Sequence, residues 1–201
     1  SIGLVFFARR MLEMNPDSKY ADVMELALHN GVLSGMALDG KSFFYVNPLE
    51  VYPKACHEDA RKFHVKPIRQ KWFGCACCPP NIARLLSSLA MYAYTENEDT
   101  LFAHLFVGGS VKKDVNGKEL SFEVTTDMPW QGTTVYSCTN EQSVHGSLAI
   151  RIPEWSRSFK VSGVTGELDE NSAQLRDGYL YITHDWKKGD TVRLELSMEA
   201  E

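Results

Sequence analysis

Three cysteines lie close together near the middle of the chain, at Cys75, Cys77 and Cys78. Pro79 and Pro80 follow directly, and proline is tolerated in the first turn of a helix. Thiols at a helix N-terminus ionise more readily, because the positive end of the helix dipole and the free backbone N–H groups favour the thiolate. The pattern predicts thiolate chemistry, either as a nucleophile or as a soft ligand for zinc.

The residues alone leave two interpretations of this cysteine cluster open. A metal or nucleophile role competes with a buried structural cluster, since neighbouring cysteines at a metal are less common than a Cys-x-x-Cys pair. Zinc takes about four ligands, and the cluster offers at most three thiolates. His57 and His64 in the preceding loop could contribute, although histidines in a polar loop are more often solvated. A complete zinc site therefore needs further groups.

The five cysteines do not suggest an ordinary disulfide framework. A bond between the neighbours Cys77 and Cys78 would close a strained ring. Cys56 and Cys138 are interpreted as isolated buried or half-exposed thiols. Reduced thiols are typical of a cytoplasmic protein, which is the location we expect.

The composition is that of an ordinary soluble globular protein, with 44% apolar and 23% charged residues among 201 and a net charge of −5. The densest basic cluster lies within residues 61–71 and is interpreted as a solvated segment, so we expect no nucleic-acid partner. No run of apolar residues approaches the roughly 18 that a membrane span needs, so we expect no membrane partner.

The elements that must position the cysteines are predicted to be helical. The spacing of apolar residues predicts helices over 3–14 and 19–30, and a hairpin over 36–45 that turns at Asp39-Gly40. Residues 47–74 are predicted to be irregular, and a third helix follows the cysteines. The apolar stripe of that helix comprises Ile82, Leu85, Leu86, Leu89, Ala90 and Ala93.

From about residue 100 the pattern changes to short runs rich in β-branched and aromatic residues, separated by turn signals. The predicted strands are 101–107, 119–125, 133–138, 146–152, 158–162, 178–183 and 190–197. Short strands at this spacing predict an antiparallel β-sandwich. Helices followed by strands indicate an α+β protein with two domains, 1–98 and 99–201.

Residues 66–84, with the sequence KPIRQKWFGCACCPPNIAR, resemble the signature of glycoside hydrolase family 127, the β-L-arabinofuranosidase family. Residues 28–35 (LHNGVLSG) and 39–49 (DGKSFFYVNPL) support the resemblance. Weaker support comes from 151–155 (RIPEW) and 177–181 (DGYLY). The similarity spans nearly the whole chain.

The resemblance implies an (α/α)6-barrel catalytic domain followed by a β-sandwich. Residues 1–98 would then be the C-terminal part of the barrel, carrying the cysteine site, and residues 99–201 the sandwich. The chain opens inside a helical pattern without an initiator Met, which also leads us to expect the C-terminal part of a larger enzyme.

The resemblance also implies a retaining glycosidase with a cysteine nucleophile, matched by Cys77. Cys78 would be a zinc ligand, and Cys77 would touch the same Zn²⁺. The implied substrate is an arabinofuranoside. Tyr45 and Trp72 are candidates for the sugar pocket, because aromatic faces with a polar atom suit sugar rings, although core packing explains them nearly as well. Tyr45 is retained as the substrate-binding candidate.

Other groups of the family's site are missing from this sequence. The family's remaining zinc ligands form a Glu-x-Cys pair expected just before Ser1, and its general-acid glutamate is expected earlier still. Glu50 and Glu58 are the carboxylates nearest the cysteines and are interpreted as solvated loop residues. We therefore expect the chain alone to be inactive.

The glycosidase is the first of three interpretations of function, and the chain's association is a separate expectation. The chain is expected to associate, as a homo-oligomer or by aggregation, through apolar faces that include Leu4, Phe7, Met11 and Leu12. A non-catalytic carbohydrate-binding or structural β-sandwich module, with a structural zinc and thiol cluster, is the second interpretation of function. A related enzyme acting on a different deoxy or acidic sugar is the third.

Overall fold

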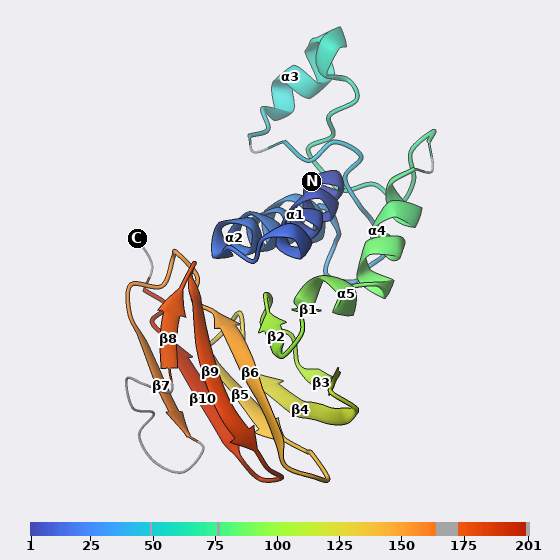
Figure 1. Ribbon diagram of the computed structural model, residues 1–201. Helices are drawn as coiled ribbons and strands as arrows, with labels where there is room; N and C mark the ends of the chain where they lie inside the picture. Colours follow the sequence, from blue (N-terminus) through green and yellow to red (C-terminus); the bar gives the residue numbers. More distant parts are fainter. Residues whose placement is uncertain (49, 76, 164–172, 200–201) are drawn as a thin grey trace. The chain divides into compact units, whose positions relative to one another are not determined.

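A computed structural model describes residues 1–48, 50–75, 77–163 and 173–199 (Figure 1). The chain divides into two compact units, each described by itself. No described helix is long and apolar enough to cross a membrane.

The first unit contains residues 1–8 and 23–89 and is called the cysteine unit. The second contains residues 9–22 and 90–201 and is called the sandwich unit. The first two helices each contribute residues to both units. The domain boundary predicted near residue 98 stays a prediction, because the two units are defined by contacts and interleave along the sequence.

The first two helices confirm the predicted helical start of the chain. Helix α1 is Ile2–Met14 and helix α2 is Ser18–Leu26. The carboxylate of Asp17 accepts a hydrogen bond from the backbone N–H of Lys19 at 3.1 Å, so the N-terminal cap of α2 comes from Asp17. The predicted helix 19–30 does not stay regular. It changes to a π-helical turn η1 (Ala27–Val32) and a 3₁₀ turn η2 (Leu33–Gly35).

The predicted hairpin over 36–45 is present as a tight turn with isolated bridges. Met36 and Phe43 form an antiparallel bridge, and the N–H of Ala37 donates to the carbonyl of Ser42 at 2.8 Å. Gly40 has a φ of 69°, a left-handed conformation that glycine adopts at little cost. The turn was therefore predicted correctly, although neither arm of the hairpin is a regular strand.

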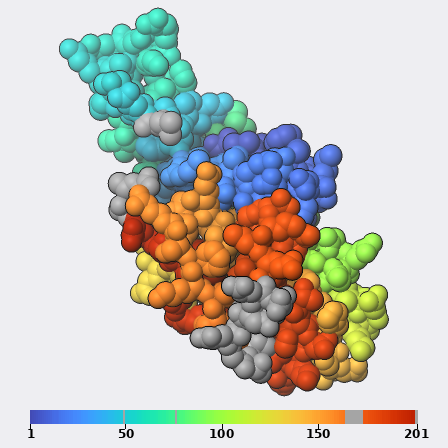
Figure 2. Space-filling view, turned by 60° about the vertical axis from the view of Figure 1, so that its left-hand side comes forward, coloured from blue at the N-terminus to red at the C-terminus, as the bar shows by residue number. Residues whose placement is uncertain are grey.

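The segment between the hairpin and the cysteines is not wholly irregular. It contains helix α3 (Pro53–Glu58) and the 3₁₀ turn η3 (Ala60–Lys62). Most side chains of residues 50–75 are exposed, and this segment forms the cyan surface in Figure 2. Its basic residues are thus mainly on the surface, as the interpretation of a solvated segment requires.

The helix after the cysteines is shorter than predicted. Helix α4 is Cys78–Ser87, and a separate short helix α5 is Ala90–Ala93. The hydroxyl of Ser88 donates to the carbonyl of Arg84 at 2.8 Å, a local bond that competes with the helical pattern. Within α4 only Leu85 is fully buried.

The sandwich unit is built from ten described strands (Figure 1). They are β1 (Tyr94–Glu96), β2 (Thr100–Ala103), β3 (Gly109–Val115), β4 (Lys118–Thr126), β5 (Thr133–Cys138), β6 (Val144–Arg151), β7 (Phe159–Gly163), β8 (Ala173–Arg176), β9 (Tyr179–Trp186) and β10 (Thr191–Leu196). All seven predicted strands overlap one of these, while β1, β3 and β8 were missed.

The strands form two five-stranded sheets, in the orders β1-β2-β6-β9-β8 and β3-β4-β5-β10-β7. Neighbouring strands are antiparallel except β2 and β6, which are parallel. The predicted antiparallel β-sandwich is therefore correct apart from this pair. The (α/α)6 barrel is not shown by the structure.

The core of the unit lies between the inner faces of the two sheets. Phe122 of β4 and Trp186 of β9 meet edge to face with ring centroids 5.0 Å apart, so one ring from each sheet packs against the other. Leu148, Ile182 and Leu194 are fully buried around them. This layer of apolar side chains is the usual core of a two-sheet sandwich.

The opposite face of the β2-β6-β9 sheet is also covered. Phe102 and Tyr179 are buried there, and residues 9–22 belong to the same compact unit. Asp22 forms an ion pair with the fully buried guanidinium of Arg151 on β6. The helical residues 9–22 are thus bound to the sandwich by a charged contact.

Candidate active site

A cleft of about 580 Å³ in the cysteine unit brings together all three predicted site residues, Cys77, Cys78 and Tyr45. Cys77 and Cys78 come from the start of α4, and Tyr45 comes from the last position of the hairpin at 36–45. The remaining lining residues are Ser1, Ile2, Gly3, Phe6, Gly31, Val32, Gly35, Phe44, Asn47, Asn81, Ile82 and Arg84. The three residues therefore share one concave surface.

The first turn of α4 sets the direction of the two thiols. Cys77 occupies the N-cap position with φ −74° and ψ −31°, and Cys78 is the first residue of the helix. Their Sγ atoms are 3.8 Å apart, and the Cys78 thiol donates to the backbone carbonyl of Tyr45 at 3.9 Å. Cys77 is exposed and Cys78 is half-buried, so Cys77 is the more accessible sulfur.

The two thiols have opposite pKa shifts. Interactions with Cys75 and Cys78, and a smaller one with the Tyr45 hydroxyl, lower the pKa of Cys77. Burial, together with the neighbouring Cys77, raises the pKa of Cys78 to about 11. The expected lowering of the thiol pKa is found at Cys77, where the neighbouring thiols are its main cause, and not at Cys78, where desolvation of the thiolate prevails.

Tyr45 lies beside the more acidic thiol. Its hydroxyl interacts with Cys77, and this interaction raises the pKa of Tyr45. Its ring packs against Phe73 with centroids 5.7 Å apart, and Phe73 packs in turn against Phe43 at 5.2 Å. Tyr45 as a whole remains 40% exposed, so the residue is accessible from solvent. Trp72 is 63% exposed and does not line the cleft.

The spacing of the two sulfurs fits a shared zinc ion. Two thiolates bound at Zn–S distances of about 2.3 Å in a tetrahedron have sulfurs about 3.8 Å apart. The Sγ atoms of Cys77 and Cys78 already lie at 3.8 Å. His57 and His64 are exposed and do not line the cleft, in agreement with solvated histidines.

The described residues do not provide a complete zinc site. Within the part of the chain that the structure describes, no group of three or more His, Cys, Asp or Glu side chains is arranged to hold a metal. Cys77 and Cys78 therefore fit as two ligands of a site whose other ligands must come from elsewhere.

Two polar residues of the cleft were missed by the sequence analysis. Asn81 and Arg84 follow Cys77 by four and seven residues, which places all three on one face near the start of α4. This helical spacing was readable in the sequence. The missing information was the cleft itself, whose lining also includes Phe6 from α1.

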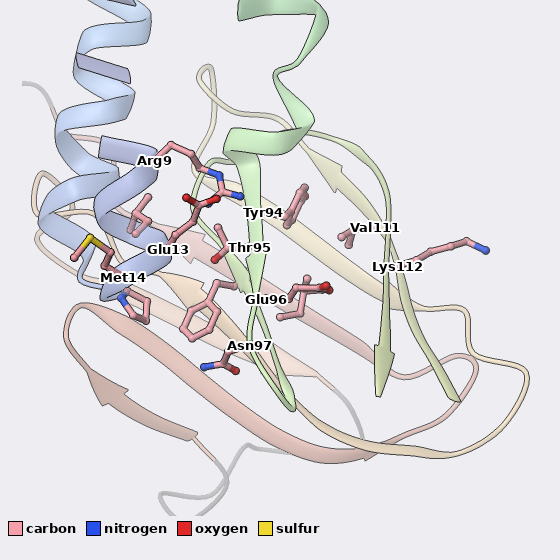
Figure 3. Close-up of a pocket in the computed structure, with 13 residues that line it drawn as sticks. Arg9, Glu13, Met14, Tyr94, Thr95, Glu96, Asn97, Val111 and Lys112 are labelled. Atoms are coloured by element: carbon pink, nitrogen blue, oxygen red, sulfur yellow. The ribbon is translucent and has the colours of Figure 1, made fainter. Parts of the chain in front are cut away.

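The sandwich unit has a separate cavity of about 650 Å³, between the end of α1 and strands β1 to β3 (Figure 3). Arg9 and Glu13 point toward each other there and form an ion pair at 3.0 Å. Lys112 points away from the cavity and binds Glu119 on β4 at 3.0 Å. None of the predicted site residues lines this cavity.

Two family models match consecutive parts of the chain. Residues 1–91 match the β-L-arabinofuranosidase GH127 catalytic domain, and residues 100–198 match the GH127 middle domain. The chain belongs to glycoside hydrolase family 127. The family resemblance of the cysteine segment is therefore confirmed, and Cys77, Cys78 and Tyr45 all lie in the part matched by the catalytic-domain model.

Known members of family 127 resemble the chain along nearly its whole length. It is 36% identical over 204 aligned positions to a non-reducing end β-L-arabinofuranosidase of Bifidobacterium longum subsp. longum, covering 99% of this chain and 30% of that protein. A crystal structure of a GH127 β-L-arabinofuranosidase from Geobacillus stearothermophilus T6 matches with a TM-score of 0.91 and 49% identity, over 100% of this chain and 31% of that one.

A solved GH127 β-arabinofuranosidase matches with a TM-score of 0.85 and 32% identity, over 98% of this chain and 31% of its own. The chain thus spans about 30% of the length of the family 127 proteins it matches.

Proposed function

We propose that the intact protein containing this chain is a retaining glycoside hydrolase that removes β-L-arabinofuranosyl residues, with Cys77 as its nucleophile. The observation that carries the proposal is an exposed thiol of lowered pKa, 3.8 Å from a second thiol, in a cleft shared with Tyr45. Family membership supports the reaction class, and the names of the relatives in Bifidobacterium and Geobacillus support the sugar.

Zinc fits this proposal as a resident cofactor. Cys77 and Cys78 would hold it, since their sulfur spacing matches two tetrahedral ligands. When bound, the ion would supply positive charge that keeps both sulfurs as thiolates. The raised pKa of Cys78 means that its thiolate depends on such a cation far more than that of Cys77 does.

The proposed reaction has two displacements at the anomeric carbon of the sugar. The Cys77 sulfur attacks that carbon, a C–S bond forms, and the glycosidic C–O bond breaks while a general acid protonates the leaving oxygen. Water then attacks the same carbon and gives its proton to the conjugate base of that acid. The C–S bond breaks, and Cys77 leaves as a thiolate. Two inversions give net retention of configuration.

The general acid has to come from another part of the intact protein. Among the described residues, the cleft lining contains no Asp or Glu. Glu58 is 66% exposed on α3, and Glu50 is also exposed. We therefore propose that this chain alone is inactive, and that its helical part completes its site within an (α/α)6 barrel of the intact enzyme.

The test uses the full-length protein, an aryl β-L-arabinofuranoside and a Cys77→Ser variant. We expect wild-type activity that depends on zinc, and a loss on the order of 10³-fold or more in Cys77→Ser. Cys138→Ala removes a thiol buried in the sandwich unit and serves as the matched control, with activity close to wild type.

Other results would change the proposal in specific ways. An equally active Cys77→Ser variant contradicts the nucleophile. An inactive wild type with stoichiometric zinc favours either a different sugar or the structural zinc module, which a screen of aryl glycosides then separates.

A further inference from the structure

The carbonyl oxygen of Cys77 accepts two hydrogen bonds from the same residue. The backbone N–H of Asn81 donates at 3.4 Å, which is a long bond for a helix. The side-chain Nδ2 of Asn81 donates at 2.7 Å, a short and well-formed bond. The side chain of Asn81 therefore holds the Cys77 carbonyl more tightly than the helical backbone does.

The two prolines in the first turn of α4 make Asn81 an important donor to the Cys77 carbonyl. Pro79 and Pro80 have no backbone N–H, so this turn has fewer donors than an ordinary helix start. Asn81 is the first residue after the two prolines that can donate. Its side chain anchors the peptide group of Cys77, and the Cα–Cβ bond that directs the Cys77 sulfur belongs to the same residue.

Arg84 fixes the orientation of the Asn81 amide. Its guanidinium donates from Nη2 to Asn81 Oδ1 at 2.9 Å. Arginine has no acceptor, so this bond requires the oxygen of the amide to face Arg84 and the NH₂ group to face Cys77. The guanidinium also lies over the ring of Phe6 at 4.9 Å from its centroid, and all four residues line the cleft.

We propose that Asn81 is a positioning residue for the Cys77 sulfur and that Arg84 acts through Asn81, by holding its amide in the donating orientation. The inference rests on the proposed function, in which Cys77 attacks an anomeric carbon. Displacing a nucleophile by about 1 Å can cost on the order of 10²-fold in rate. The contact between Asn81 and Cys77 therefore affects kcat more than KM.

The test compares Asn81→Asp with wild type in the full-length protein. Aspartate keeps the size and the acceptor facing Arg84, but it cannot donate to the Cys77 carbonyl. We expect kcat to fall about 10- to 100-fold, with KM within about 3-fold and zinc content unchanged. Ser87→Ala is the matched control, because it removes a 3.1 Å bond to the Arg84 carbonyl at the other end of α4.

A double-variant comparison tests the route through Arg84. Arg84→Gln is expected to lower kcat less than Asn81→Asp does, and the double variant is expected to be no slower than Asn81→Asp alone. Additive effects would show that Arg84 acts independently and would overturn its assigned role. Equal losses in Asn81→Asp and Ser87→Ala would show that α4 stability alone is responsible and would overturn the role of Asn81.

A second readout separates this inference from the proposed function. The rate at which iodoacetamide modifies Cys77, followed by peptide mass spectrometry on the chelator-treated protein, reports the ionisation and accessibility of the thiol without any glycoside. An inactive wild type would contradict the proposed function. An Asn81→Asp variant with the wild-type kcat, or with the wild-type alkylation rate if the enzyme is inactive, would contradict the positioning role.

Discussion

The Nδ1 atom of His104 and the hydroxyl of Tyr179 form a 2.6 Å hydrogen bond inside the sandwich unit, with both side chains fully buried. The other ring nitrogen, Nε2, lies 2.7 Å from the hydroxyl of Thr95 on β1. Burial, followed by the charges of Arg9 and Arg151, lowers the pKa of His104 to about 3. The imidazole is therefore neutral in the folded protein at any ordinary pH.

This buried histidine predicts a loss of stability in acid. In the unfolded chain its pKa is about 6.5, so below that pH the unfolded state binds a proton that the folded state does not. The contribution of His104 to the free energy of unfolding falls as pH drops from about 6.5 toward 3, by about 1.4 kcal/mol per pH unit. Between pH 7 and pH 5 the loss is about 2 kcal/mol.

The measurement is chemical denaturation of wild type and His104→Gln at several pH values between 7 and 5. The variant has no group to titrate there, so its free energy of unfolding should depend less steeply on pH than that of wild type. Thr126→Val, which removes a 2.8 Å hydrogen bond to Thr134 in the same unit but no titratable group, is the control and should keep the wild-type slope. An unchanged slope in His104→Gln contradicts the assignment.

The ion pair between Asp22 and Arg151 predicts a large effect on stability. Arg151 is fully buried, so Asp22→Asn leaves its charge without the carboxylate that compensates it. We expect the free energy of unfolding to fall by about 3 kcal/mol. Glu119→Gln, which breaks the exposed pair with Lys112, should cost less than about 1 kcal/mol. Denaturation curves of the two variants check this difference, and equal costs would count against it.

The strands and helices with clear apolar periodicity were predictable from sequence. The strand β5 (Thr133–Cys138) was predicted with its observed bounds, because its sequence is rich in β-branched and aromatic residues. The strand β3 was missed, since GSVKKDV buries only two of its seven residues and offers little pattern. The strand β3 forms by pairing with β4, a tertiary contact that its own sequence does not reveal.

The candidate site was predictable where its reactive residues are neighbours in the sequence. The spacing of the cysteines and the prolines after them indicated the segment, and the family resemblance implied the roles of Cys77 and Cys78. The raised pKa of Cys78 was not predictable, because it depends on burial. The contacts of Asn81 with Cys77 and with Arg84 follow helical spacing, whereas Arg84 packs over the Phe6 ring, a contact between residues far apart in sequence that no local pattern reveals.

The cysteines should differ in their reactivity. At pH 8 and after zinc removal, iodoacetamide should modify Cys77 about 10-fold faster than Cys78, whose pKa of about 11 leaves little thiolate. Cys56 and Cys138 are buried and should react last. Time-resolved peptide mass spectrometry of the alkylated protein gives the order. A Cys78 that reacts first would contradict the assignment of Cys77 as the nucleophilic thiol.

The Tyr45 hydroxyl should help to keep Cys77 acidic. It is one of the groups that lower the pKa of Cys77, so Tyr45→Phe should raise that pKa. Tyr52→Phe is the control, since its hydroxyl interacts with Glu50 and Tyr52 does not line the cleft. Thiolate absorbance followed against pH in the chelator-treated protein, with Cys77→Ser subtracted, measures the shift. If Cys77 titrates in Tyr45→Phe as it does in wild type, the Tyr45 hydroxyl does not lower the pKa of Cys77. The proposed role of Tyr45 would then be contact with the sugar alone.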